Sequence, residues 1–340
     1  MSSSASAILT AAEYVAARLA AVGVSLLDVD ATERTAAALG RLLYRLDRRH
    51  RDRTLRNIRL AFPHWSDQQA RRIARDSFAH LIQLVIEVVH TPRVLQPATW
   101  PKHVRLAGLG PAIELLNARH PAILLTGHLG NWEVLGYLLA LLGYDVDAIA
   151  RPLDNPLINR WLLGIRQRRG MRIITKWDAT DRMIHVLQAG GALGFIADQN
   201  AGDKGLFVPF FGRLASTYKS IGLLAMSHNA AIICGYAHRV APGYQFELGV
   251  EDIIHPEDWQ HRHDPLFYIT ARYSRAMEMM IRRRPEQYLW MHRRWKSRPR
   301  HERQGKPMPK ALRRNLEELP WMSQSQLEQL LHPPAPLPSD

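Results

Sequence analysis

Apolar residues follow two patterns along the chain, and the patterns alternate from residue 101 onward. Short apolar runs bounded by glycine or polar residues predict buried strands, and longer segments with apolar residues at helical spacing predict helices. Such alternation predicts a single α/β domain with a central mixed or largely parallel sheet flanked by helices. The predicted strands are 121–127, 146–150, 172–175, 192–198, 230–240 and 244–250, and the predicted helices are 131–143, 155–170, 179–190, 219–229 and 265–284.

The first hundred residues show helical spacing without strands. Segment 5–47 predicts two Ala/Leu-rich helices, and 52–62 and 67–90 predict two more, separated by Pro63 and with Ser66 as an N-cap. Because arginines flank the first pair, two interpretations are equally supported. The pair is either an amphipathic unit that lies on a membrane or an ordinary pair packed on the core.

One segment near the N-terminus is the only candidate for a membrane span. Glu13 and Arg18 interrupt it, and no other segment has about 20 consecutive apolar residues. We therefore predict that the chain does not cross a membrane, although this helix is able to lie on one. Beyond Pro299 the chain lacks clear periodicity, which predicts a surface-bound or mobile tail. The resulting division is N-terminal interfacial helices (1–50), a central domain (51–300) and a basic, proline-containing tail (301–340).

The composition adds one further observation, which is an excess of positive charge. The 340 residues include 45 Lys and Arg against 31 Asp and Glu, a formal net charge of +14. Segment 41–75 has eleven arginines against three aspartates, and segment 282–314 has thirteen lysines and arginines against two glutamates. Such patches predict an anionic partner, which is a nucleic acid, an acidic membrane surface or a polyanionic substrate.

The sharpest chemical feature is residues 126–133 (TGHLGNWE), which join a predicted strand to a predicted helix. Ligands of open α/β sheets bind at the carboxyl ends of strands, where His128 lies. Asn131 is a suitable N-cap, which places Glu133 in the first helical turn. A histidine removes a proton from a hydroxyl when a carboxylate holds its ring, and Glu133 reaches His128 if the loop folds back. The alternative is that His128 only caps a helix end and Glu133 only complements the helix dipole, and spacing alone favours this alternative.

A second carboxylate lies at the end of another predicted strand. Strand 192–198 ends at Asp198, and the loop after it carries Phe207, Phe210 and Phe211. A carboxylate beside an aromatic wall suits an acyl or other apolar substrate. The alternative is a turn aspartate that precedes a core-filling hairpin.

Basic residues and tryptophans form further candidates for binding. The arginines that end helix 155–170 either bind a phosphate or complement the dipole of that helix. In segment 287–299, tryptophans alternate with basic residues, which suits stacking on nucleic acid bases or a membrane interface. The candidates for membrane or phosphate contact are Arg151, Arg168, Arg169, Trp290, Arg293, Arg294, Trp295 and Lys296.

Seven motifs in order along the chain carry a family resemblance. They are RNIRLAFP (56–63), GHLGNWE (127–133), RPLDNP (151–156), RQRRG (166–170), ADQNAG (197–202), FVPFFG (207–212) and QYLWMHRRWKSRP (287–299). Through them, roughly residues 40–300 resemble the bacterial lipid A biosynthesis (lauroyl/myristoyl) acyltransferases, of the lysophospholipid-acyltransferase-like superfamily. The resemblance implies a glycerolipid-acyltransferase-like fold and transfer of a fatty acyl chain from acyl carrier protein or coenzyme A to a membrane glycolipid. A lipid A precursor is the expected acceptor, and another (phospho)glycolipid is the alternative.

The resemblance also implies roles for individual residues. His128 is the general base, Glu133 completes an H-x4-E pair, and Arg166 and Asp198 are further active-site residues. We expect an oxyanion to be stabilised by Arg166 or by backbone N–H groups near 130–132. Transfer is expected to be direct, without a covalent intermediate, cofactor or metal. The residues expected to support the site or line an acyl groove are Gly130, Asn131, Trp132, Phe207, Phe210 and Phe211.

Expected partners follow from the same resemblance. They are acyl carrier protein, an anionic membrane surface and the glycolipid acceptor, with no nucleic acid. The expected location is the cytoplasmic face of the inner membrane, with peripheral or weak attachment because Glu13, Arg18 and Asp28 dilute the N-terminal helix. Three other functions stay open, namely a basic nucleic-acid-binding protein, a thioester hydrolase in which His128 activates water, and a non-catalytic lipid-binding protein.

Overall fold

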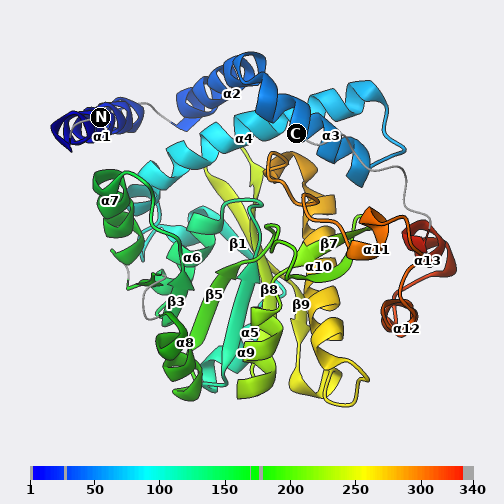
Figure 1. Cartoon of the computed structure of the whole chain (residues 1–340). Helices are drawn as coiled ribbons and strands as arrows, with labels where there is room; N and C mark the ends of the chain where they lie inside the picture. The colour runs from blue at the N-terminus through cyan, green and yellow to red at the C-terminus, as the bar shows by residue number, and fades with distance from the viewer. Residues whose placement is uncertain (1–2, 27–28, 169, 176–178, 332–340) are drawn as a thin grey trace.

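A seven-stranded sheet forms the centre of the computed structural model, which describes residues 3–26, 29–168, 170–175 and 179–331 (Figure 1). The strand order is β1-β9-β8-β2-β5-β3-β4, and all neighbours are parallel except β8 and β9. The predicted α/β fold with a mixed, largely parallel sheet is therefore confirmed. The strands of this sheet are β1 Val104–Ala107, β2 Ala122–Thr126, β3 Val146–Ile149, β4 Arg172–Ile174, β5 Ala192–Ile196, β8 Ala231–Ala241 and β9 Gln245–Ile254.

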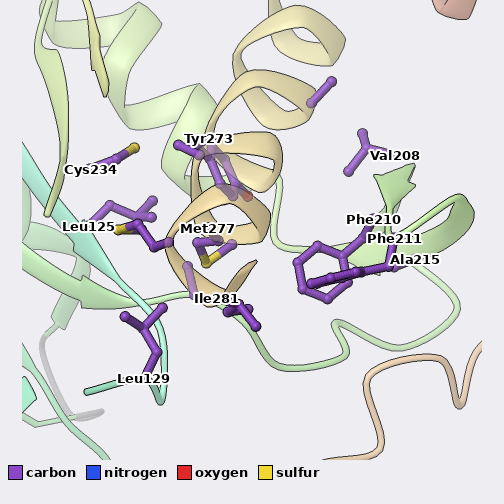
Figure 2. Packing of buried hydrophobic residues seen from close by; sticks show 14 of the residues in the cluster. Leu125, Leu129, Val208, Phe210, Phe211, Ala215, Cys234, Tyr273, Met277 and Ile281 are labelled. Atoms are coloured by element: carbon purple, nitrogen blue, oxygen red, sulfur yellow. The ribbon is translucent and has the colours of Figure 1, made fainter. Parts of the chain in front are cut away.

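Helices cover both faces of the sheet. Ile123 and Leu193 are partners in register on β2 and β5 and belong to the largest hydrophobic cluster, with residues of α9 and α10. Figure 2 shows Leu125 and Cys234 of the sheet beside Tyr273, Met277 and Ile281 of α10. The opposite face lies against α5, α6 and α7. These helices are α5 Gly110–Asn117, α6 Trp132–Leu141, α7 Pro156–Gln167, α8 Ala179–Gln188, α9 Ser220–His228 and α10 Pro265–Arg283, with short 3-10 turns η1 Trp100–Lys102, η2 Pro256–Asp258 and η3 Pro285–Gln287.

The loop after β5 forms an antiparallel hairpin, β6 Leu206–Phe210 and β7 Arg213–Thr217. Phe210 and Phe211 are buried in the main cluster, and the Ser274 hydroxyl of α10 donates to the Pro209 carbonyl at 3.1 Å. The side chain of Arg294 is also buried and donates to Thr217 Oγ1 at 2.6 Å. The expectation that Phe210 and Phe211 form a substrate wall is therefore wrong, because the core-filling hairpin encloses both rings.

Of the four N-terminal helices, α2, α3 and α4 lie across one end of the sheet, and α1 lies at the edge of the molecule (Figure 1). Ser66 accepts from the backbone of Gln69 and Gln69 bonds back to Ser66, so the predicted N-cap is a full capping box. The N-terminal helices are α1 Ser3–Ser25, α2 Val29–Leu46, α3 Arg48–Ala61 and α4 Asp67–Val94.

Helix α1 lies at the edge of the molecule and packs on α4 and α7. Its polar groups face α7, because Asn155 donates to Glu13 at 2.9 Å and Arg18 lies over the ring of Trp161. Its apolar side chains remain outside, with Ile8 70% and Leu19 68% exposed. By length and composition, Ile8–Ser25 is able to cross a membrane. The two charges therefore do not disqualify it, contrary to our expectation.

The chain beyond Pro299 continues as three short helices, α11 Arg300–Arg303, α12 Lys310–Glu317 and α13 Gln324–Leu331. Leu316, Leu327 and Leu330 are buried in the main hydrophobic cluster. Of the two predicted forms of this tail, surface-bound or mobile, the structure shows the bound form as far as Leu331. Helix α11 buries no residue, α12 buries Leu316, and α13 buries Leu327 and Leu330, which is too few for a periodic signal.

Trp290 and Trp295 lie inside the protein, contrary to the expected contact with a membrane. Trp290 is 1% exposed, donates from Nε1 to the Pro285 carbonyl at 2.7 Å and packs edge-on against Phe62 and Tyr288. An internal acceptor for the indole N–H allows complete burial. The same burial removes both rings from any stacking on nucleic acid bases.

We expect Trp290→Ala to lower the free energy of unfolding by about 3–5 kcal/mol, because it leaves a large cavity in the core. Leu39→Ala on the exposed face of α2 is the control, with an expected change below about 0.5 kcal/mol. Urea unfolding followed by circular dichroism measures both. Equal, small changes for the two variants contradict the burial of Trp290.

Candidate active site

His128 and Asp198 meet at the carboxyl ends of two neighbouring parallel strands. Thr126 of β2 and Ile196 of β5 are partners in register, so the loops that follow these strands lie side by side. His128 Nδ1 lies 2.7 Å from Asp198 Oδ1. The Asp198 side chain is fully buried, whereas 19% of the His128 side chain is exposed and open to a substrate.

The two side chains shift the pKa of one another in opposite directions. Burial by itself raises the pKa of Asp198, but the charge of His128 and the hydrogen bond outweigh it and hold that pKa well below its usual range. Burial opposes protonation of His128, but the charge and hydrogen bond of Asp198 leave the pKa of His128 above its usual range. An ionised Asp198 only accepts hydrogen bonds, so Nδ1 carries the proton and Nε2 of the neutral ring has a free lone pair.

Glu133 does not hold the ring of His128, contrary to the expected pairing. It lies in the first turn of α6, as predicted, but its carboxylate accepts from Arg166 Nε at 2.8 Å and from Arg166 Nη2 at 2.5 Å. Trp132 Nε1 also donates to it at 3.1 Å. Glu133 acts on His128 through its charge alone, which helps to raise the pKa of His128.

Backbone hydrogen bonds fix the loop between His128 and α6, so the loop does not fold Glu133 back onto His128. The backbone N–H of Gly130 donates to the Gln287 carbonyl at 2.8 Å, and that of Asn131 to the Ala237 carbonyl at 2.7 Å. Gly130 has φ of +54°, and a Cβ there collides with the Ala237 carbonyl, so glycine is required. Because these two N–H groups have partners, they are not available as the expected oxyanion donors.

A buried polar network fixes the start of α6. Asn131 is the N-cap, accepting from Val134 N at 3.0 Å, and its amide donates to Glu87 of α4 at 2.7 Å. Arg239 of β8 donates to both oxygens of Glu87, at 2.6 and 2.8 Å. The predicted N-cap is therefore confirmed. Its partners lie on other elements, so the sequence pattern contained no signal for them.

His292 is a site residue that the sequence analysis missed. Its ring lies 4.5 Å from that of His128, measured between centroids. Asn57 of α3 holds this segment by donating to the His292 carbonyl at 2.9 Å. Burial and the charge of His128 lower the pKa of His292 to about 4, so its ring is neutral near pH 7. The basic residues around it made segment 287–299 resemble a surface.

An apolar pocket lies between the sheet and helices α5, α6 and α7. It is a narrow cavity of about 130 Å³, and its lining is almost entirely apolar. Leu124, Gly194 and Ala148 form part of its floor on three neighbouring strands, and Glu133 and Arg166 supply charged groups. Of the residues expected to line an acyl groove, Trp132 lines this pocket, whereas Phe207, Phe210 and Phe211 do not.

Trp132 connects the pocket to the histidine, because its ring meets that of His128 edge-on at 5.0 Å. The pocket, the His128–Asp198 pair and the Glu133–Arg166 pair thus form one continuous site. In the part of the chain that the structure describes, no three His, Cys, Asp or Glu side chains are arranged to hold a metal ion.

The remaining candidates for membrane or phosphate contact divide by burial. Those on the surface or partly exposed are Arg151, Arg168, Arg293 and Lys296. Those buried in the protein, and so excluded from such contact, are Trp290, Arg294 and Trp295. Arg169 lies outside the described residues.

A histidine paired with a carboxylate beside an apolar pocket is an arrangement that suits acyl transfer. The model of the family described as bacterial lipid A biosynthesis acyltransferase matches residues 7–297. The chain belongs to this family and is an acyltransferase.

Named relatives include two from Escherichia coli (strain K12). The chain is 27% identical over 274 residues to its lipid A biosynthesis lauroyltransferase, covering 78% of this chain and 85% of the relative. It is 25% identical over 283 residues to its lipid A biosynthesis myristoyltransferase, covering 80% and 83%. It is also 25% identical over 284 residues to lipid A biosynthesis acyltransferase 2 of Shigella flexneri, covering 82% and 88%.

We expect Asp198→Asn to lower the pKa of His128 below its ordinary value of 6.5, because burial then acts without the opposing carboxylate. An NMR titration of the His128 ring protons measures this shift. Glu133→Gln is the control and lowers the pKa less, since Glu133 acts only through its charge. An unchanged pKa in Asp198→Asn contradicts the assigned pair.

Proposed function

We propose that the protein transfers a fatty acyl chain from the thioester of acyl carrier protein, or of coenzyme A, to a hydroxyl of a lipid A precursor in the membrane. The observation that carries this proposal is the polarised His128–Asp198 pair beside an apolar pocket. The names of the relatives support the acceptor. Another phosphorylated glycolipid is the alternative acceptor.

In the proposed reaction His128 acts as a general base. The acceptor hydroxyl points its proton at Nε2, and its oxygen attacks the thioester carbonyl carbon as Nε2 takes the proton. Asp198 stabilises the imidazolium ion that forms. The carbon–sulfur bond then breaks and the leaving sulfur takes the proton from His128. This sequence leaves an ester, a free thiol and a neutral histidine, with no acyl-enzyme intermediate.

Arg166 is the proposed stabiliser of the oxyanion. Two of its five N–H groups bond to Glu133, which leaves three for the negative oxygen of the tetrahedral intermediate. Both residues line the pocket and are mostly buried, so their interactions are little screened by water. In this proposal, Glu133 is the positioning residue for Arg166.

The apolar pocket is the proposed site of the acyl chain. Gly194 and Ala148 have small side chains and are paired on β5 and β3, which leaves space above the floor of the pocket. The thioester carbonyl would then lie between Trp132 and Arg166, near Nε2 of His128.

Helices α1 and α2 are the proposed membrane contact, on the cytoplasmic face of the inner membrane. Leu39, Leu42 and Leu46 of α2 are exposed along one side of the helix, as are the apolar residues of α1. An exposed apolar surface beside arginines suits an anionic bilayer. The attachment is peripheral or weakly anchored in this proposal.

We expect His128→Ala to lower kcat by roughly 10²- to 10⁴-fold, because the general base is lost. The assay follows transfer of a labelled acyl chain from acyl carrier protein to a purified lipid A precursor in detergent. His261→Ala, on the surface, is the control and keeps full turnover. Near-normal turnover in folded His128→Ala contradicts the proposal, and release of free fatty acid at the same rate without acceptor indicates a hydrolase instead.

We expect Ala148→Leu to shift the preferred donor toward shorter chains by roughly two carbons, because the larger side chain fills pocket space in a close-packed interior. Competition among acyl carrier proteins loaded with chains of different length measures the preference. Leu153→Ala, exposed after β3, leaves the preference unchanged. An unchanged preference in Ala148→Leu argues against this pocket as the acyl site.

A further inference from the structure

A groove of about 630 Å³ lies between α1, α4 and α7. Each of these helices contributes one arginine to its walls, namely Arg18 from α1, Arg93 from α4 and Arg168 from the end of α7. None of the described residues that line the groove is acidic, and none of them also lines the apolar pocket. The groove is therefore a basic site that the proposed reaction does not use.

The three arginines keep N–H donors for a ligand. The guanidinium carbon of Arg18 lies 5.3 Å from the centroid of the Trp161 ring, a contact that fixes this side chain without a carboxylate. Arg93 donates from Nη1 to the Ser25 carbonyl at 3.0 Å, which uses one of its five N–H donors. The side chain of Arg168 is exposed, and the described part of the groove offers it no carboxylate. An anion in the groove thus finds donors on all three helices.

The apolar part of the groove continues onto the outer surface of α1. Val22 of α1 lines the groove together with Ile165 of α7, and 51% of Val22 is exposed. Leu19, three residues earlier on α1, is 68% exposed. An apolar strip therefore leads from the groove to the surface of α1 that is proposed to meet the bilayer. A ligand that suits both parts has an anionic group and apolar chains.

The groove and the active site share the last turn of α7. Arg166, in this turn, bonds to Glu133 in the active site. Its neighbours Ile165 and Arg168 line the groove. A ligand that binds Arg168 is thus attached to the same turn that presents Arg166 to the reacting groups.

We propose that this groove binds the phosphate headgroup of an anionic glycerophospholipid of the bilayer, with phosphatidylglycerol as the representative. The proposal rests on the membrane contact proposed above, but not on the acyl transfer. Guanidinium groups match phosphate geometry, and basic pockets between helices at a membrane surface bind anionic headgroups. A phospholipid fits better than the acceptor, because the apolar strip leads its chains toward the bilayer and the groove is separate from the pocket beside His128.

Native mass spectrometry of the protein released from detergent micelles tests the proposal. The micelles contain phosphatidylglycerol and phosphatidylcholine in equal amounts, and the headgroup of the second also carries a positive charge. Wild type is expected to retain one phosphatidylglycerol at least roughly fivefold more often than phosphatidylcholine. Arg168→Gln is expected to reduce this preference, and the double variant Arg93→Gln, Arg168→Gln to abolish it. Arg18 is left unchanged, because its contact with Trp161 helps to hold α1 on α7.

Arg160→Gln is the matched control for Arg168→Gln, because Arg160 is an exposed arginine of the same helix that does not line the groove. It keeps the preference of the wild type. Equal retention of the two lipids by wild type, a preference that survives in the double variant, or an equal loss in Arg160→Gln and Arg168→Gln overturns the proposal. A phosphorylated glucosamine disaccharide lipid that displaces phosphatidylglycerol from wild type assigns the groove to the acceptor and also overturns it.

A second measurement places the lipid and separates the groove from the proposed reaction. Monomeric dihexanoyl-phosphatidylglycerol is expected to shift the indole N–H resonance of Trp161, which Trp161→Phe identifies, in wild type and in His128→Ala alike. No shift in either protein contradicts the groove. Retention of phosphatidylglycerol by a wild type that transfers no acyl chain keeps the groove and rejects the proposed function. Acyl transfer by a wild type that retains no phosphatidylglycerol rejects the groove alone.

Discussion

The hydrogen bond between Asp198 and His128 is the constraint on which the surrounding structure depends. A carboxylate that is fully removed from water is costly unless a partner neutralises it, and His128 is that partner. The two residues meet only because β2 and β5 are adjacent, parallel and in register at their carboxyl ends. The core below these strands and the carbonyls that hold residues 128–131 keep the two loops aligned.

The two carboxylates of the site pair with different basic side chains. Asp198 is paired with a histidine that gains and loses a proton, whereas Glu133 is paired with an arginine that stays charged. In the proposed reaction, the first pair takes and returns the proton, and the arginine of the second pair supplies a fixed positive charge. Both residues of the H-x4-E motif lie in this site, although they bond to different partners and not to each other.

The local pattern of apolar residues was sufficient to predict most helices and strands between residues 121 and 284, because buried strands and amphipathic helices have distinct periods. It missed β1 and α5, which are only four and eight residues long. It also assigned Glu133 to His128, since pairing across β2 and β5 depends on strand order rather than on spacing. Trp290 was assigned to a membrane interface because a tryptophan among arginines has the same sequence pattern at a surface and in a core. His292 and the pocket below α6 required the tertiary structure.

The contact between α1 and α7 has a geometric consequence. Glu13 and Arg18 join α1 to the helix whose last turn carries Arg166. A bilayer that receives the apolar side of α1 is therefore held at a set height relative to the reacting groups. In the proposed function, an acceptor would rise from that bilayer by a distance determined by its own headgroup, so only hydroxyls at one level would meet His128. Helix α1 would then set the distance between the bilayer and the site, and this distance would select which hydroxyl of a sugar is acylated.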